Sequence, residues 1–553
     1  MAKRWQRELQ DSARDVADLK NYIDLKPDEL EKPSEMRWLR EIDGGRASLS
    51  CAGAVSEDAP RYRAYTLQNF RELPQVQRLG EEQQFAIEVV AQVLPFKTNN
   101  YVVEELIDWD SVPDDPMFVL NFPQREMLLP HHFEEIAALL RRGADRWEIE
   151  AAANRIRLEL NPNPAGQMDH NVPSLDGVRL TGMQHKYGAT VLVFPSNGQT
   201  CHAYCTFCFR WPQFVGMDKL KFAMREAELL VKYVRRHPEV CEVLFTGGDP
   251  MIMRARSLAR CIEPLLEARL PNLRTIRIGT KTLGYWPYRF LTDDDAEELL
   301  DLFRKVTESG IHLALMAHFN HPRELSTAAA KAAIARIRAT GAQIRTQSPL
   351  MRNINDSPEV WSEMWREQVQ LGCIPYYMFV ARDTGAQHYF SLPLVRAWEI
   401  FRDAYKSVSG ICRTVRGPSM SADPGKVQVV GVTTVAGKKV IALRMLQARN
   451  PDWVMRPFFA EYDERATWLS DLRPAFDEER FFFEDELERM YREDRARQRG
   501  LPRNGRNGAP NGGNGARNDG NGARDEDQPL PVTHRSRTAR TSGPRRGGHS
   551  RRA

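Results

Sequence analysis

The stretch Ala189-Thr-Val-Leu-Val-Phe-Pro-Ser-Asn-Gly-Gln-Thr-Cys201-His-Ala-Tyr-Cys205-Thr-Phe-Cys208 joins a short β-rich run to three closely spaced cysteines. The run at 189–194 predicts a buried strand, and Asn197-Gly198 is a turn signal that ends it. The cysteines are therefore expected on a loop that follows the carboxyl end of a strand. In parallel α/β folds this is the edge of the sheet at which binding sites form.

Further β-rich runs follow, and amphipathic stretches of helical period separate them. Strands are expected at 243–245, 275–279, 312–317, 343–347 and 375–379, and helices at 219–236, 293–309, 327–339 and 392–408. This alternation implies a parallel sheet in an α/β fold. With about six units, the pattern favours a partial (β/α)6-type barrel over a doubly wound sheet.

The regions that flank the barrel differ from it in composition. We predict an N-terminal helical region at 1–165 with a loop-rich insertion at about 33–80, the barrel at 166–445, a helical and irregular extension at 446–497 and a disordered Gly/Asn/Arg-rich tail at 498–553. The N-terminal helices are expected to wrap on another part of the chain. The tail holds too few apolar residues to bury the surface that folding requires.

The net charge of +4 is unevenly distributed over the 553 residues. Residues 501–553 contain eleven arginines and four acidic residues, which is a net charge of +7, so the rest sums to about −3. We expect the tail to be a solvated appendage, and without a basic stripe in the body a nucleic-acid partner is not expected.

Composition also bears on the compartment. No run of ~18 apolar residues suggests a membrane span. Residues 1–19 are charged throughout, unlike a secretory signal. Eight cysteines in a chain of this length do not form a disulfide scaffold, so a cytoplasmic location fits best.

The three clustered cysteines offer a specific kind of site. Thiolates of Cys201, Cys205 and Cys208 can hold three irons of a cubane cluster and leave the fourth iron open to a small molecule. A zinc site or buried structural cysteines are the alternatives. Zinc requires a fourth ligand, and His202 is poorly placed to supply it.

This pattern, with Phe207 before the last cysteine, resembles the radical S-adenosylmethionine superfamily. Phe245-Thr-Gly-Gly-Asp-Pro250 follows about forty residues later, at the end of the second strand. In that superfamily such a motif holds the methionyl amino group, which implies that Gly247, Gly248 and Asp249 bind S-adenosylmethionine. Taken alone, Gly-Gly-Asp would favour a plain turn; its place at the end of the strand that follows the cysteine unit favours the binding function.

A closer resemblance is to the lysine 2,3-aminomutase family, over roughly residues 4–32 and 165–445. It is carried by Cys201–Gly216, Thr246–Pro250, Ile276–Thr280, His318–Pro322, Gln347–Ser348, Asn353–Asp356 and Pro375–Tyr377. The resemblance implies transfer of an amino group from C2 to C3 of an α-amino acid, with a [4Fe–4S] cluster, S-adenosylmethionine and pyridoxal 5′-phosphate as cofactors. It adds Phe207, His318 and Gln347 to the expected cofactor contacts. A flavodoxin- or ferredoxin-type electron donor is expected, and a homo-oligomer is one option.

The same resemblance assigns the pyridoxal phosphate residues. Lys426, in Asp423-Pro-Gly-Lys426, occupies the place of the lysine that forms the Schiff base. Lys186 and Tyr187, in His185-Lys186-Tyr187, match the motif that clamps the phosphate. The second arginine of the family clamp is Thr190 here, so the clamp is either weaker or rebuilt.

The substrate residues depart from the family. Arg210 matches the arginine that binds the substrate α-carboxylate. The two aspartates that hold the lysine ε-ammonium fall on Arg382, beside Asp383, and on Arg416 in an ungapped alignment. Two cations would repel a lysine side chain by several kcal/mol in a dry pocket, which predicts an acidic substrate such as glutamate. Alternatively, both arginines point outward or pair with Asp383 and Asp423.

Other functions remain open at this point. The same cofactors could support deamination, epimerisation or desaturation, with lysine or glutamate as the main substrate choices for a mutase. A cluster-bearing protein without catalysis, or a metal-free α/β domain with an RNA-binding tail, are the alternatives outside enzymology. No cysteine follows Cys412, so the zinc-binding cysteines at the C-terminus of the family are missing.

Overall fold

The computed structural model describes residues 60–216, 223–224 and 227–499. These residues all fall within one compact unit. The beginning of the predicted N-terminal helical region and much of the insertion predicted at about 33–80 lie outside the described residues. So do the first part of the helix predicted at 219–236 and the predicted tail from residue 500 onward.

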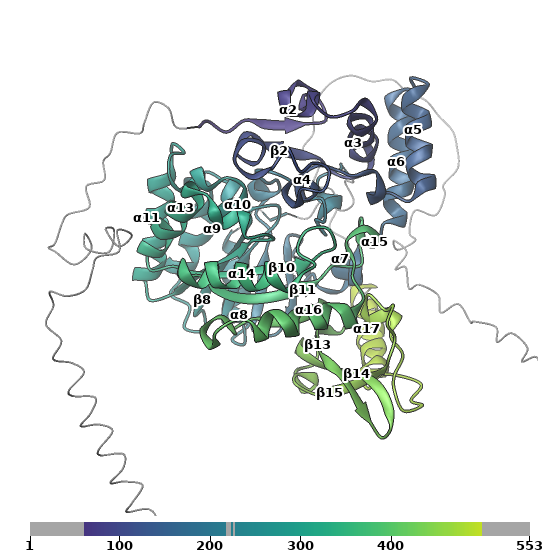
Figure 1. Cartoon of the computed structure of the whole chain (residues 1–553). Helices are drawn as coiled ribbons and strands as arrows, with labels where there is room; N and C mark the ends of the chain where they lie inside the picture. Colours follow the sequence, from purple (N-terminus) through teal and green to yellow (C-terminus); the bar gives the residue numbers. More distant parts are fainter. Residues whose placement is uncertain (1–59, 217–222, 225–226, 500–553) are drawn as a thin grey trace, which may run out of the picture. The chain divides into compact units, whose positions relative to one another are not determined.

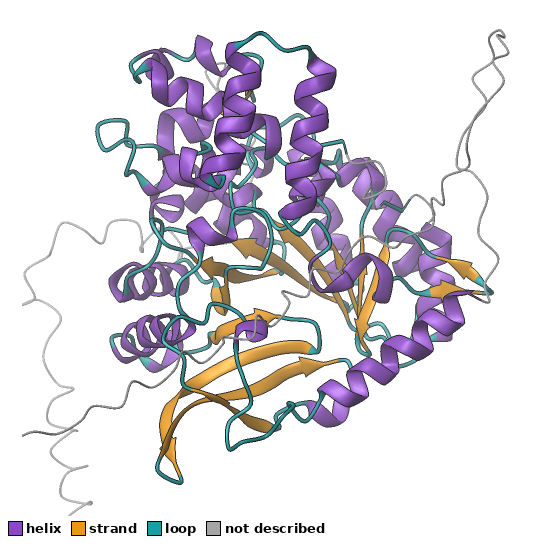
Figure 2. Cartoon of the chain, turned by 90° about the vertical axis from the view of Figure 1, so that its right-hand side faces the viewer, coloured by secondary structure: helices purple, strands orange, loops and turns teal. Residues whose placement is uncertain are grey.

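Seven consecutive parallel strands form the centre of the fold (Figures 1 and 2). They are β6 (Thr190–Val193), β7 (Glu242–Phe245), β8 (Thr275–Thr280), β9 (His312–His318), β10 (Gln343–Leu350), β11 (Ile374–Val380) and β12 (Arg416–Ser421). The strands neighbour one another in chain order, without the reversal that marks a doubly wound sheet. Because helical crossovers are right-handed, this order places the helices on one side and curls the sheet, as in a barrel. The predicted partial barrel is confirmed, and β12 adds a strand that the sequence pattern did not reveal.

The described helices that cover the barrel are amphipathic; four of them lie within predicted ranges, whereas those at 255–267 and 358–370 were not predicted. They are α8 (Ala227–Arg236), α9 (Ala255–Glu267), α11 (Ala296–Glu308), α13 (Ala328–Ala339), α14 (Pro358–Gln370) and α16 (Leu394–Lys406). In α9, for example, Leu258, Ile262 and Leu265 lie on one face and are fully buried. They belong to the same hydrophobic core as Ile276 and Ile278, which alternate along β8.

An antiparallel layer extends the sheet beyond β12. It consists of β13 (Gly425–Val435), β14 (Lys438–Ala448) and β15 (Pro457–Glu461), and α17 (Glu484–Arg499) lies beside it (Figures 1 and 2). A separate core, which includes Trp453, Phe458 and Phe483, joins these strands to the start of α17 at Leu487. The extension predicted as helical and irregular therefore also contributes the strand β15.

The N-terminal elements pack against the loops of the barrel. They include β1 (Ala64–Thr66), β2 (Lys97–Asn99), α3 (Glu81–Val93), α4 (Pro116–Asn121), α5 (Pro130–Arg141) and α6 (Arg146–Glu159) (Figure 1). Their core contains Trp211 and Trp286, which come from barrel loops. β1 pairs with β2 although residues 64–66 fall in the predicted loop-rich insertion, because the pairing partner lies about thirty residues further along the chain.

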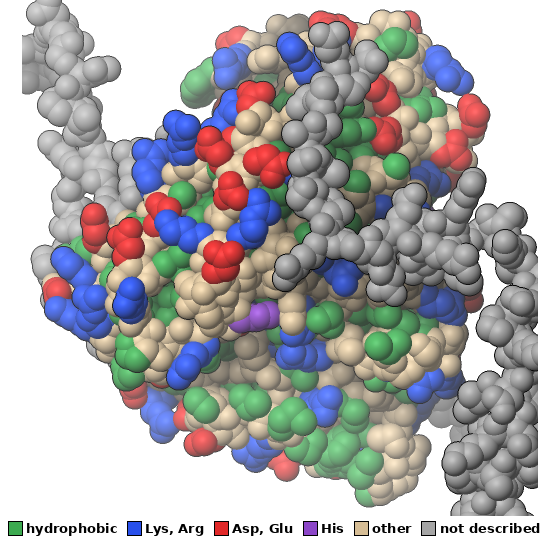
Figure 3. Space-filling model, turned by 90° about the vertical axis from the view of Figure 1, so that its left-hand side faces the viewer, with side chains coloured by type: hydrophobic (Ala, Val, Ile, Leu, Met, Phe, Trp, Pro, Cys, Tyr) green, Lys and Arg blue, Asp and Glu red, His purple; other side chains and the backbone are tan. Residues whose placement is uncertain are grey.

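Within the described residues, no helix is both long and apolar enough to cross a membrane. On the face shown in Figure 3, basic and acidic side chains alternate among apolar ones, and no basic stripe crosses this part of the described surface.

Candidate active site

Most of the predicted site residues lie at or after the carboxyl ends of neighbouring parallel strands, and Lys426 on the antiparallel strand β13 pairs with the last residue of β12. The cysteine loop follows β6, Gly247–Asp249 follow β7, His318 ends β9, Gln347 lies on β10, Arg382 follows β11, and Lys426 is the second residue of β13. Residues far apart in sequence thereby reach one edge of the sheet, where parallel barrels place their sites.

The three cysteine thiols lie near one another without touching. Burial raises the pKa of Cys205 to about 11 and that of Cys208 to about 12, and the Cys205 thiol raises the pKa of Cys208 further. The three Sγ atoms do not all fall within 4.8 Å of one another. Tetrahedral zinc would bring its sulfur ligands to about 3.8 Å from each other. At least one pair of Sγ atoms is therefore farther apart than in a zinc site, which agrees with a cubane cluster, whose cysteine ligands bind separate irons.

The N-terminal elements hold the cysteine loop in place. Lys97 Nζ donates to the Cys201 carbonyl at 2.8 Å, and Tyr62 Oη donates to the His202 carbonyl at 2.7 Å. The His202 ring is buried, its Nδ1 lies 3.0 Å from Thr282 Oγ1, and burial lowers its pKa to about 3. His202 is thus a neutral structural residue. It does not join the thiols as a fourth ligand in this arrangement.

The Gly-Gly-Asp motif is tightly packed against the start of that loop. A Cβ at Gly248 would lie 2.4 Å from the Thr200 carbonyl oxygen, so only glycine fits there. Asp249 accepts hydrogen bonds from Met251 N, Thr280 Oγ1, Lys281 N and Thr282 Oγ1, at 2.8–3.0 Å. Four acceptor positions are therefore used within the protein. The role of Gly247, Gly248 and Asp249 in binding S-adenosylmethionine stays a prediction, and the structure adds a role in positioning the cysteine loop.

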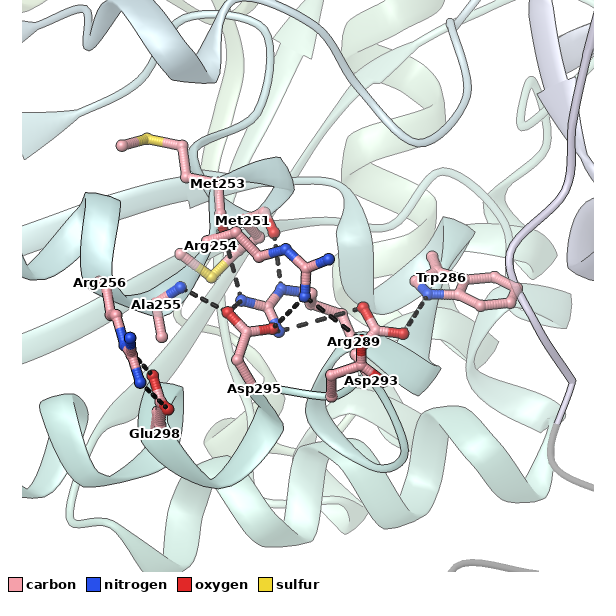
Figure 4. A network of polar contacts seen from close by, with 11 residues as sticks. Met251, Met253, Arg254, Ala255, Arg256, Trp286, Arg289, Asp293, Asp295 and Glu298 are labelled. Carbon is pink, nitrogen blue, oxygen red and sulfur yellow. Dashed lines mark hydrogen bonds and ion pairs between the residues drawn. The ribbon is translucent and has the colours of Figure 1, made fainter. Parts of the chain in front are cut away.

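An arginine that the sequence analysis missed anchors the residues after Asp249 (Figure 4). Arg289 is 3% exposed and donates to the Met251 carbonyl at 2.9 Å and to the Met253 carbonyl at 3.1 Å. Asp295 pairs with its guanidinium at 2.9 Å. Its interactions link three separate loops, so no local motif could have revealed it.

His318 and Gln347 lie side by side, as their register on β9 and β10 requires. His318 Nε2 lies 2.6 Å from Gln347 Nε2, and burial, followed by the Lys281 charge, lowers the pKa of His318 to about 3. A neutral imidazole accepts this hydrogen bond from the amide. Lys281 itself forms a buried ion pair with Glu324 and donates to the His318 carbonyl at 3.2 Å. Neither Lys281 nor Glu324 stood out in the sequence.

Phe207, the remaining predicted cofactor contact, is half-buried on the cysteine loop. Its ring meets that of Phe390 edge-on, with centroids 6.4 Å apart. The ring therefore packs between the loop and the barrel, and its contact with a cofactor stays a prediction.

Lys426 is a lysine without a carboxylate partner. Its Nζ lies 4.5 Å from the centre of the Tyr377 ring and 5.7 Å from that of Phe379, and it forms no ion pair with a described residue. Burial lowers the pKa of Lys426 to about 7, and the Arg277 and Arg416 charges contribute to this shift. Near neutral pH such an amine is partly unprotonated and therefore nucleophilic.

Lys186 lies in β5 (Met183–Tyr187), the edge strand beside β6. Its Nζ donates to the Ala422 carbonyl at 2.6 Å, which brings it to the turn that precedes Lys426. Burial, followed by the Arg449 charge, lowers the pKa of Lys186 well below its usual value. The predicted phosphate residues and the predicted Schiff-base lysine therefore lie in one region.

Arg210 is a buried cation, 8% exposed, that forms no hydrogen bond or ion pair through its side chain with another described residue. Its guanidinium lies 4.3 Å from the centre of the Phe194 ring and 5.0 Å from that of Phe209. Burial, followed by the Arg382 charge, lowers the pKa of Arg210 to about 9. A buried guanidinium without an ion-pair partner carries a desolvation cost, which the binding of an anion would offset.

Arg382 and Arg416 have different neighbours. Arg382 lies 5.0 Å from the centre of the Phe209 ring, near Arg210, and its Nε is buried without a hydrogen-bond partner. Asp383 Oδ1 is likewise without a partner, while Asn161 Nδ2 donates to the Asp383 carbonyl at 2.6 Å. Arg416 is exposed at the start of β12, opposite Tyr377, whose hydroxyl accepts its hydrogen bond at 3.3 Å. The strand register thus places Arg416 away from the carboxyl end of β12 and from Arg382, on the side of Lys426, whose pKa its charge lowers. The roles of Arg382, Asp383 and Arg416 in binding the substrate stay predictions.

Comparisons with known proteins agree with this site. A protein of Aquifex aeolicus, provisionally named L-lysine 2,3-aminomutase, is 30% identical over 396 residues, which are 72% of this chain and 92% of that protein. The L-lysine 2,3-aminomutase of Fusobacterium nucleatum is 26% identical over 66% of this chain and 78% of its own, and that of Clostridium subterminale 28% identical over 46% and 58%. No model of a known protein family matches the chain.

Solved structures give a weaker likeness. A radical S-adenosylmethionine methyltransferase of Sphaerobacter thermophilus matches with a TM-score of 0.30 and 16% identity, over 53% of this chain and 94% of its own. A methyltransferase of the same kind from Kitasatospora setae matches with a TM-score of 0.25 and 14% identity, over 36% and 38%.

The barrel, its three-cysteine loop after the first parallel strand and the related sequences define a radical S-adenosylmethionine enzyme. Such enzymes use an iron–sulfur cluster and S-adenosylmethionine. Within that class, the chain belongs to the lysine 2,3-aminomutase family.

Proposed function

We propose that this protein is a pyridoxal phosphate-dependent 2,3-aminomutase that acts on an acidic α-amino acid. The observation that carries the proposal is Lys426, a lysine without an ion-pair partner whose pKa lies at about 7. It is electrostatically coupled to Lys186, which belongs to the predicted phosphate motif. A structural lysine in a β-strand would instead be expected to reach water or a carboxylate.

The cofactors divide the chemistry among them. When bound, the cluster and S-adenosylmethionine supply radical hydrogen abstraction, and pyridoxal phosphate supplies a π-system that assists nitrogen migration. In this proposal Cys201, Cys205 and Cys208 hold the cluster and Lys426 binds pyridoxal phosphate covalently. The protein binds and orients the cofactors and the substrate, and it excludes water from them.

In this proposal the N-terminal elements cover the cysteine loop and keep water away from the cofactors. Lys97 and Tyr62, which precede the barrel in sequence, donate to the carbonyls of the cysteine loop. Thr206, between the second and third cysteines, donates through its backbone N–H to the Leu120 carbonyl of α4 at 3.0 Å. A closed chamber is what radical chemistry requires, because water and oxygen would intercept a reactive species.

The substrate class rests on the cations near the predicted substrate position. Arg210 is a buried cation without an acid, and it is assigned to the α-carboxylate. Arg382 lies next to it and carries a buried Nε without a partner. Together they favour a substrate with two carboxylates, and they oppose the ammonium of lysine. Asp383 argues for a basic substrate instead, because its buried Oδ1 has no hydrogen-bond partner and could accept a hydrogen bond from an ammonium group.

An anaerobic assay tests the proposal. The purified protein is reconstituted with iron and sulfide, supplied with pyridoxal phosphate, S-adenosylmethionine and dithionite, and offered glutamate, aspartate, lysine or arginine separately. The expected result is 5′-deoxyadenosine formation stimulated by an acidic amino acid, together with its β-amino isomer. Stimulation by lysine alone would refute the substrate class. Cleavage of S-adenosylmethionine with a deaminated or epimerised product would refute the mutase outcome.

A further inference from the structure

The predicted phosphate clamp lacks one of its two cations. Thr190 stands where the family resemblance places an arginine, and its hydroxyl donates to Glu242 Oε1 at 2.9 Å. The same carboxylate oxygen pairs with Arg277 at 2.6 Å. Thr190 therefore offers a phosphate no charge, and the neighbouring Arg277 is already paired with Glu242, so Lys186 is left without the expected partner.

We propose that Arg449 supplies the missing cation and binds the phosphate of pyridoxal phosphate together with Lys186. This inference rests on the proposed function. Arg449 follows β14 and lies beyond residue 445, where the resemblance to the family ends. No motif in the sequence points to it.

The backbone and side chain of Arg449 fasten it to the turn that precedes Lys426. Its backbone N–H donates to the Pro424 carbonyl at 3.0 Å. Its Nε donates to the Asp423 carbonyl, also at 3.0 Å. Arg449 is thus bound to Pro424 and Asp423, which lie two and three residues before Lys426, the lysine to which the cofactor would be attached.

The other side of the guanidinium reaches the predicted phosphate motif. Arg449 Nη2 donates to Asn171 Oδ1 at 2.9 Å, and the Asn171 carbonyl accepts from the backbone N–H of His185 at 2.7 Å. His185 directly precedes Lys186 and Tyr187. Among charged groups, Arg449 has the largest effect on the pKa of both Lys186 and Tyr187. Arg449 therefore bridges the two segments that a bound cofactor must also bridge.

The charge balance favours an anion. The Arg449 side chain is 7% exposed, and the acid nearest to it is Asp423, 3.8 Å from Nη2 to Oδ1 and 30% exposed. The hydroxyl of Tyr491 donates to that same Oδ1. Two cations, Lys186 and Arg449, thus share one partly exposed carboxylate, whereas a phosphate dianion would compensate the remaining charge. A guanidinium fork also matches the geometry of phosphate oxygens.

The C-terminal helix α17 orients the arginine. The Arg449 guanidinium lies 5.2 Å from the centre of the Tyr491 ring, and that ring stacks on His170 with centroids 3.9 Å apart. A stacked guanidinium has few orientations left, so its fork is fixed before any ligand arrives. The extension after residue 445 is therefore part of the site rather than an appendage.

The test compares two ligands that differ only in the phosphate. Kd values for pyridoxal phosphate and for pyridoxal are measured on the full-length protein by equilibrium dialysis, for wild type, Arg449→Gln and Arg444→Gln. Arg444 is a matched control, because it lies on β14 and donates to Gln428 Oε1 at 2.8 Å. Loss of one charge-assisted contact is expected to weaken pyridoxal phosphate by roughly 10- to 100-fold in Arg449→Gln. Pyridoxal binding should change by less than about threefold, and Arg444→Gln should alter neither.

Two results would overturn the proposal. An equal loss for both ligands would show that Arg449 only holds the fold, and an unchanged Kd for pyridoxal phosphate would show that it makes no contact. Arg449→Lys keeps the charge but not the fork, so it should give an intermediate loss for pyridoxal phosphate alone, and it serves if the glutamine variant does not fold. Borohydride trapping on Lys426 separates the two hypotheses. If Lys426 of the wild-type protein is not labelled, the proposed function itself is wrong. If Lys426 is labelled and Arg449→Gln binds pyridoxal phosphate as tightly as the wild type does, only this inference is wrong.

Discussion

Lys426 should react with pyridoxal phosphate near neutral pH, where ordinary lysines do not. Its pKa lies at about 7 instead of 10.5, because burial disfavours the ammonium and Arg277 and Arg416 repel it. At pH 7 roughly half of the Lys426 amines are unprotonated, against about one in 3,000 for a lysine of pKa 10.5. The reactive fraction is therefore higher by about a thousandfold.

The assay measures the rate of pyridoxal attachment to the cofactor-free protein between pH 5.5 and 10, by absorbance and by borohydride trapping with peptide mapping. Pyridoxal is used so that the ionisation of a phosphate does not enter. The rate at Lys426 should rise through a midpoint near 7. In Arg416→Gln the midpoint should move upward, because a repelling cation is removed, whereas attachment to surface lysines in Lys426→Ala should still rise towards 10.5. A midpoint above about 9 at Lys426 in the wild type would refute the reasoning.

Three further predictions concern other parts of the site. Cys205→Ala should lose most of the reconstituted iron and its visible absorbance, whereas Cys412→Ala, a buried cysteine outside the loop, should keep both; equal iron in the two variants would exclude the cluster assignment. Arg382→Gln should reduce glutamate-stimulated 5′-deoxyadenosine formation at least tenfold through KM, and an unchanged KM would remove Arg382 from the substrate site. Lys281→Met leaves the fully buried Glu324 without its cation, so urea unfolding should show a loss of about 3–5 kcal/mol, and a loss below about 1 kcal/mol would contradict the buried pair.

The barrel strands and the cysteine loop could be predicted from local sequence, because both depend on the spacing of residues within a short segment. Short β-rich runs located β8 and β9, and three cysteines within eight residues indicated the cluster site. The strand β12 escaped notice because Arg416-Gly-Pro-Ser-Met-Ser421 has weak strand propensity. Its pairing with β11 and β13 makes it a strand.

Contacts between distant segments could not be predicted in the same way. The contact of Asp423 with Tyr491 joins residues 68 positions apart, and Arg449 meets Asn171 across 278 positions. The different surroundings of Arg382 and Arg416 depend on strand register, which an ungapped alignment does not contain. The sequence by itself determined the class of chemistry, because the spacing of three cysteines after a strand is local and the motifs around them resemble one family, which also assigned Lys426. Only the tertiary structure decided which cations surround that lysine, because charge and burial depend on segments that meet only when the chain folds.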